Sequence, residues 1–156
     1  MGWKEAMKKW RANNKEDIRA YGEQYYEKNK ERNKEQCKEW RKNNPDRNAQ
    51  KSLRRYSLKK KLRSDFTFDE WEECKTFFDY KCAYCGQETK EYVQEHFIPV
   101  SKQGGYTKGN IVFSCKTCNL SKTNHDFFHW YKRKPFYSHE REKRVLDYLE
   151  MQSDGG

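Results

Sequence analysis

The pattern of hydrophobic and polar positions changes near residue 64. Before that point apolar residues are sparse, and Lys, Glu, Arg and Gln, which favour helices, dominate. Trp10, Tyr25 and Trp40 recur every 15 residues, and each is followed by a polar stretch that contains Asn. We expect residues 3–64 to form short basic helices joined by tight turns at these stretches, or one long kinked helix. So few apolar residues cannot build a core on their own.

A different pattern begins at Thr67. The order Thr-Phe-Asp-Glu over residues 67–70 is typical of a capping box, in which the hydroxyl and the carboxylate satisfy free helix N–H groups. We expect a helix from there to about Phe78. Its spacing places Trp71 and other aromatic residues on one face, so these rings are expected in the core.

The remaining elements are shorter. Residues 92–96 and 111–113 are expected to be strands, and a helix is expected from Cys118 to about Tyr131. Ser138 is a good N-cap for a final amphipathic helix, and the five residues 152–156 are expected to be disordered. The pattern therefore predicts an α+β domain that follows a basic helical arm.

The charge is divided unevenly along the 156 residues, of which 33% are hydrophobic and 37% charged. Residues 1–64 contain 21 Lys and Arg against nine Asp and Glu, so their net charge is +12. Residues 65–156 contain 13 against 15, so their net charge is −2. A polyanionic partner for the arm is the natural interpretation, and a solvated basic helix that keeps the chain soluble is the alternative.

The sequence has no apolar run of the length needed to cross a membrane and no apolar stretch typical of a secretory signal at its start. We therefore expect no membrane partner and a cytoplasmic protein, in a bacterial or phage-infected cell. In a reducing compartment, paired cysteines more often hold a metal ion than form disulfides.

Two Cys-x-x-Cys pairs are the strongest chemical signal. Cys82 and Cys85 form the first pair, and Cys115 and Cys118 form the second. Four thiolates provide the closed tetrahedral shell that Zn²⁺ prefers in structural sites. Such an ion has no open position for a reaction, so catalysis would depend on the polar residues between the pairs, foremost Glu95-His96.

These segments together resemble the zinc-containing HNH endonucleases of phage type. The resemblance rests on the two cysteine pairs, on Glu95-His96, on residues 109–112 (Gly-Asn-Ile-Val) and on residues 118–122 (Cys-Asn-Leu-Ser-Lys), and it extends over about residues 65–151. It implies a ββα-metal module flanked by helices. The main departure is Glu95, where the family more often has Asp.

Roles can be assigned from the chemistry of phosphodiester hydrolysis. His96, with an ordinary pKa of about 6.5, is the expected general base. Glu95 and Asn119 offer hard oxygen ligands for a catalytic Mg²⁺ or Mn²⁺. By resemblance, Asn110 braces the loop that orients His96, and Lys122 is expected to hold a phosphate oxygen.

The sequence thus predicts a basic DNA-binding arm over residues 1–64 and an HNH nuclease domain over residues 65–151. Its partner is expected to be DNA, most simply double-stranded, and its activity metal-dependent hydrolysis that nicks DNA or cuts both strands. The alternative is a non-catalytic zinc module that binds nucleic acid. Besides Lys122, the residues expected to contact nucleic acid are Arg54, Arg55, Lys59, Lys60 and Lys61.

Overall fold

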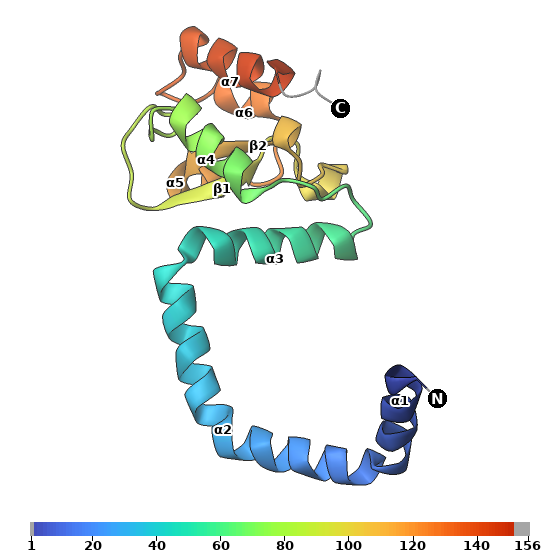
Figure 1. The fold of residues 1–156 in the computed structure, drawn as a ribbon. Coiled ribbons are helices and arrows are strands. Elements are labelled where there is room, and N and C mark those ends of the chain that lie inside the picture. Colours follow the sequence, from blue (N-terminus) through green and yellow to red (C-terminus); the bar gives the residue numbers. More distant parts are fainter. Residues whose placement is uncertain (1, 152–156) are drawn as a thin grey trace. The chain divides into compact units, whose positions relative to one another are not determined.

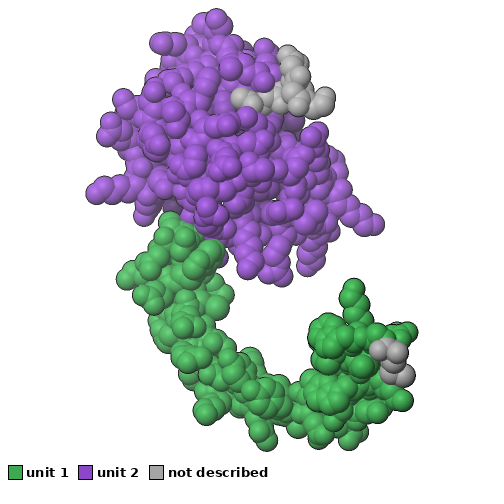
Figure 2. Space-filling view, viewed as in Figure 1, with its two compact units in different colours: residues 1–45 green, residues 46–156 purple. Residues whose placement is uncertain are grey.

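The computed structural model describes residues 2–151 and divides the chain into two compact units, residues 1–45 and residues 46–156 (Figure 2). The predicted disordered tail at residues 152–156 lies outside the described residues. Within residues 2–151, no helix has the length and apolar character that a membrane span requires.

The first unit is made of two helices, α1 (Trp3–Asn13) and α2 (Lys15–Asn43), neither of which has a buried residue. Asn14 separates them, at one of the predicted turns. The turn predicted around Asn29 is wrong, because α2 continues through it and curves along its length (Figure 1). The Asn29 amide donates to the carbonyl of Tyr25, one turn earlier, so this polar side chain is satisfied within the helix.

Helix α3 (Pro45–Lys59) begins at the expected proline. Proline suits the first helical position because a backbone N–H there has no acceptor within the helix, so its absence costs no hydrogen bond. From Asp46 onward α3 belongs to the second unit. Its inner face buries Ser57 and packs Leu53 against the core, and Gln50 donates to the carbonyl of Phe66. The predicted division between arm and domain is at residue 64, whereas the compact units divide at residue 45, so the second unit includes this basic helix.

Helix α4 (Phe68–Phe77) begins with the predicted capping box. The Thr67 hydroxyl accepts from the backbone N–H of Glu70, and the Glu70 carboxylate accepts from the backbone N–H of Thr67. The predicted core position Trp71 is fully buried and packs on Phe113, with 5.5 Å between the ring centroids. The local signal and the tertiary contact thus agree.

A two-stranded antiparallel sheet forms the centre of the second unit. It pairs β1 (Tyr92–His96) with β2 (Ile111–Cys115), and His96 is opposite Ile111. Between the strands the chain makes two short 3₁₀ turns, η1 (Val100–Lys102) and η2 (Lys108–Asn110). Both predicted strands are confirmed, and β2 is two residues longer than expected.

The helix predicted from Cys118 to Tyr131 is two helices, α5 (Lys116–Lys122) and α6 (Phe127–Tyr131). The break is at Thr123, whose φ of 49° is incompatible with a continuous right-handed helix. Asp126 then caps α6 by accepting from the N–H of His129. One uninterrupted helix was therefore wrong, although both ends of the segment are helical.

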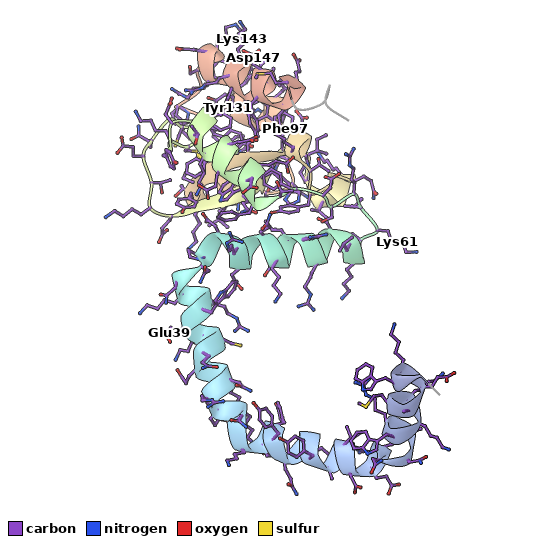
Figure 3. The ribbon with its side chains drawn as sticks, viewed as in Figure 1. Glu39, Lys61, Phe97, Tyr131, Lys143 and Asp147 are labelled. Atoms are coloured by element: carbon purple, nitrogen blue, oxygen red, sulfur yellow. The ribbon has the colours of Figure 1, made fainter. Side chains whose placement is uncertain are left out.

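The final helix, α7 (His139–Met151), begins after the predicted cap, Ser138, whose hydroxyl accepts from the N–H of Arg141. Val145 and Leu149 are buried in the aromatic core. The side chain of Tyr131 lies within this core, whereas that of Lys143 points away from α7 (Figure 3).

Candidate metal and catalytic site

The first cysteine pair occupies a tight turn that is fastened to the sheet. The N–H of Gly86 donates to the carbonyl of Cys82, and Gly86 has a φ of 74°, which glycine adopts without strain. The N–H of Ala83 donates to the carbonyl of Phe113 on β2 at 2.8 Å. The turn therefore holds its two thiols in a fixed position beside the end of β2.

The second cysteine pair connects the sheet to α5. Cys115 is the last residue of β2 and the N-cap of α5, and its Sγ accepts from the N–H of Cys118 at 3.3 Å. The four sulfur atoms of both pairs lie within 4.8 Å of one another. In a tetrahedral zinc shell with bonds of about 2.3 Å, sulfur atoms are about 3.8 Å apart, so the four thiols fit this ion.

One of these thiols is prepared to bind as a thiolate. A hydrogen bond from the Cys118 thiol lowers the pKa of Cys82 to about 4, against the opposing effect of burial. The thiolate is the form of cysteine that binds metal. The predicted cluster of four cysteines is thus assembled, and its donor set suits a structural zinc.

At the end of β1, Glu95 is only 5% exposed and forms a buried ion pair. Its Oε1 atom accepts from Nζ of Lys122 at 2.8 Å, and Lys122 also donates to the carbonyl of His96 at 2.9 Å. Burial raises the pKa of the Glu95 carboxyl, and the charge of Lys122 opposes this shift. Lys122 therefore fastens α5 to the strand that carries Glu95 and His96.

Lys122 is fully buried, which differs from the exposed position expected of a phosphate ligand. This placement depends on Glu95 across the fold, and the sequence around Lys122 gives no local signal for it. Asn119 is partly exposed, and within residues 2–151 its side chain makes no hydrogen bond.

The His96 imidazole is held neutral. Burial, followed by the positive charge of Lys122, lowers the pKa of His96 to about 4. The Nε2 atom is buried and has no hydrogen-bond partner within the described chain. A neutral imidazole whose ring nitrogen is free of structural bonds meets the first requirement for accepting a proton.

Asn110 ties down the loop that follows His96. Its Oδ1 accepts from the N–H of Ile98 at 2.7 Å, and its Nδ2 donates to the carbonyls of Ile98 and Gly105 at 3.0 and 2.8 Å. Gly104 passes so close that a Cβ atom there would be 1.7 Å from the Ile98 carbonyl oxygen. These bonds provide the geometry that the expected bracing role requires.

Tyr106 is a residue that the sequence analysis did not single out. Its ring is fully buried, 5.9 Å from the His96 ring, and its hydroxyl donates to Oε1 of Gln94 at 2.5 Å. Its backbone pairs with the segment after α3, since the N–H of Tyr106 donates to the carbonyl of Arg63. Only its position shortly after two glycines in the loop hinted at this role.

Apart from the buried Lys122, the basic residues predicted to contact nucleic acid are exposed, on α3 and on the turn that follows it. Burial raises the pKa of the Tyr106 hydroxyl, and the positive charge of Arg54 opposes this shift. Arg54, at the start of this basic surface, is therefore close to Tyr106. The side chain of Lys61 extends from the far end of α3 (Figure 3). Residues 46–64 contain eight Lys and Arg and one acidic residue, Asp46. The densest positive charge is therefore in the same compact unit as the candidate site.

Comparison with known proteins agrees with this geometry. The family model described as HNH endonuclease matches residues 82–125. The chain is also 29% identical over 110 residues to the "SPbeta prophage-derived putative HNH endonuclease YoqL" of Bacillus subtilis (strain 168). That similarity covers 62% of this chain and 48% of the relative, so the chain spans about half the length of the protein it matches.

The matched segment contains both cysteine pairs, the Glu95-His96 pair and helix α5. Its strand–loop–strand–helix order is the order of β1, the braced loop, β2 and α5. Residues 82–125 thus match the HNH endonuclease family model in sequence, and the structure arranges them in this order of elements.

Proposed function

We propose that this protein is a metal-dependent DNA endonuclease that hydrolyses phosphodiester bonds. The observation that carries the proposal is the neutral His96 beside the buried Glu95, at the point where β1 faces α5. The match of residues 82–125 to the HNH endonuclease family supports a reaction of the nuclease type.

His96 is the proposed general base. Its pKa of about 4 leaves the imidazole unprotonated near neutral pH, so it is available to take a proton from a water molecule that attacks the phosphate. Asn110 holds the loop next to His96, which limits the movement of the ring relative to a bound phosphate. The backbone of the loop after His96, held by Asn110, therefore helps to position the base.

Glu95 and Asn119 are the proposed ligands of a catalytic Mg²⁺ or Mn²⁺, because both ions favour oxygen donors. When bound, such an ion stabilises the charge on the phosphate and on the departing 3′-oxygen. Lys122 is better placed to orient the Glu95 carboxylate than to bind DNA, since it occupies Oε1 of that group. We therefore assign Lys122 a positioning role.

The basic surface of α3 and the following turn, with the arm before it, is the proposed DNA-binding region. Its charge suits the phosphates of double-stranded DNA. Arg54 on this surface is close to Tyr106, and the ring of Tyr106 is 5.9 Å from that of His96. One active site per chain cuts one strand per encounter, so a monomer would nick, leaving a 5′-phosphate and a 3′-hydroxyl. We expect the reaction to take place in the bacterial cytoplasm, where cysteine thiols remain reduced.

A plasmid nicking assay tests the proposal. We expect the purified chain to convert supercoiled plasmid to open circles with Mg²⁺ or Mn²⁺ and to lose this activity in excess chelator. The variant His96→Ala should retain its fold and DNA binding but lose cleavage. Absence of cleavage by a folded, zinc-loaded wild-type chain with either ion would instead support a non-catalytic zinc module that binds nucleic acid.

A further inference from the structure

The aromatic rings of the first unit remain exposed, and Tyr25 makes a local stacking contact with Tyr21, with 6.3 Å between the ring centroids. Helices α1 and α2 contain no buried residue, and the rings of the 15-residue repeat, those of Trp10, Tyr25 and Trp40, are 54%, 53% and 44% exposed. Burying an aromatic side chain is favourable, so rings that recur and remain exposed indicate a surface for a partner.

The three repeats have the same local structure. Asn14, Asn29 and Asn44 each donate through the side-chain amide to the carbonyl four residues earlier, which belongs to the aromatic residue of that repeat, at 2.7, 2.7 and 2.9 Å. Tyr25 and Trp40 both lie on α2, whereas Trp10 lies on α1, so the regularity is that of the sequence interval and of this local hydrogen bond. A recurring contact along an extended partner fits this regularity.

The charge around the rings indicates the class of partner. Trp10 and Trp40 are each followed directly by arginine, Arg11 and Arg41. A shallow hollow of about 260 Å³ on α1 is lined by Trp3, Met7 and three basic residues, Lys4, Lys8 and Arg11. Flat rings beside cationic side chains match a polymer that alternates flat bases with phosphates.

A second copy of the chain is a poorer match. A helix that pairs with another helix needs apolar residues every three or four positions. The ten residues from Glu27 to Gln36 are all polar, so the middle of α2 offers nothing to such an interface. Single rings separated by polar segments suit stacking on individual bases better than continuous helix packing.

We infer that residues 2–43 bind single-stranded nucleic acid, with unpaired bases stacking on Trp10, Tyr25 and Trp40 and phosphates held by the neighbouring Lys and Arg. A duplex exposes base faces only at its ends, so these rings select unpaired segments over duplex. The inference deepens the proposed function by naming a feature of the substrate, and it rests on that function only for the choice of DNA over other polyanions.

The binding experiment uses the full chain without added divalent cation and a fluorescent oligothymidine. The triple variant Trp10→Leu, Tyr25→Leu, Trp40→Leu keeps the charge of the arm. We expect it to lose at least tenfold in affinity for the oligothymidine, because stacking on each ring contributes substantially. Its affinity for a duplex of the same length should change less than threefold.

Adjacent tyrosines provide a matched pair of single variants. Tyr25→Leu removes a ring of the repeat, and Tyr26→Leu removes one that is equally available, at 60% exposed, but outside the repeat. We expect a loss of threefold or more from the first and less than twofold from the second. Equal losses would overturn the assignment of the repeat as the stacking surface.

Unchanged oligothymidine binding in the triple variant would overturn the inference. If the wild-type chain sedimented as a dimer and the triple variant as a monomer, the rings would instead pack on a second copy of the chain. That result also overturns the inference. Plasmid nicking by the triple variant is measured in parallel. If this variant still binds oligothymidine and still nicks plasmid, the inference fails and the proposed function stands. If the triple variant loses oligothymidine binding and the wild-type chain does not nick plasmid, the inference stands while the proposed function fails.

Discussion

Residues 2–43 and residues 46–151 are both rich in helix, but their helices are stabilised differently. In the first region no side chain is buried, and the contacts are local, such as the exposed ion pairs of Lys30 with Glu27 and Lys34 with Glu31. Each such pair stabilises a helix by only about 0.2–0.5 kcal/mol. In the second region the helices surround the aromatic core, a cysteine cluster and a buried ion pair.

The comparison shows that the positive charge is densest in the region with a buried core, not in the region whose side chains are exposed. Residues 1–45 contain 13 Lys and Arg against eight acidic residues, whereas residues 46–64 contain eight against one. The most basic segment is therefore on the compact unit that contains the candidate catalytic residues, whereas residues 1–45 have mixed charge and exposed rings. The following changes should separate the two regions, beginning with the one of largest effect.

Removal of one zinc ligand should affect only the compact unit. In Cys85→Ser or Cys118→Ser we expect zinc binding to fall below one equivalent and the near-ultraviolet circular dichroism of the aromatic core to be lost. Structural zinc contributes about 10–16 kcal/mol of binding energy to folding in small zinc-finger peptides. The helical signal of the arm should persist, because it depends on no contact with the cluster. Full zinc content with unchanged melting in either variant would refute the four-cysteine site.

The His96→Ala variant should affect chemistry without affecting either region's structure. General-base catalysis typically contributes a factor of about 10²–10⁴, so we expect nicking rates to fall by that amount. Zinc content, melting temperature and duplex affinity should match those of the wild type. Wild-type nicking by this variant would end the assignment of His96 as the base.

Lys122→Met should destabilise the compact unit, because it leaves the Glu95 carboxylate buried without its partner. Breaking a buried ion pair in this way typically costs about 3–5 kcal/mol, and urea denaturation measures it. Lys116→Met on the same helix is the control, since its side chain is 58% exposed and lies 4.0 Å from Glu91. Surface pairs of this kind contribute at most about 1 kcal/mol. Equal stability of the two variants would argue against the positioning role of Lys122.

Charge removal should distinguish the two regions in duplex binding. The triple variant Arg55→Gln, Lys59→Gln, Lys60→Gln should reduce the salt dependence of duplex affinity by about two to three phosphate contacts. The matched arm variant Lys8→Gln, Lys9→Gln, Lys15→Gln removes the same charge, and we expect a reduction of less than about one contact. If the arm variant has the larger effect, the duplex is bound by the arm and the basic α3 surface is secondary.

Much of the candidate site could be predicted because its signals are local. The capping box at Thr67, strand β1 and the four cysteine ligands depend on spacing and on neighbouring residues. The burial of Lys122 was not predicted, because it depends on where Glu95 lies across the fold. The break at Thr123 was missed for a related reason, since no Gly or Pro marks it and the positive φ is imposed by surrounding structure.

Cys115 is at once the end of β2, the cap of α5 and a member of the cysteine cluster. The chain therefore has very different tolerance for insertions before and after the two-stranded sheet. Extra residues at 89–90, between the Lys81–Glu88 bridge and β1, leave the paired residues on both sides in register. One extra residue between Cys115 and Asn119 rotates the rest of α5 by about 100° and turns Lys122 away from its partners on β1. Variation in length among proteins with this module should accordingly be found in the first segment and be absent from the second.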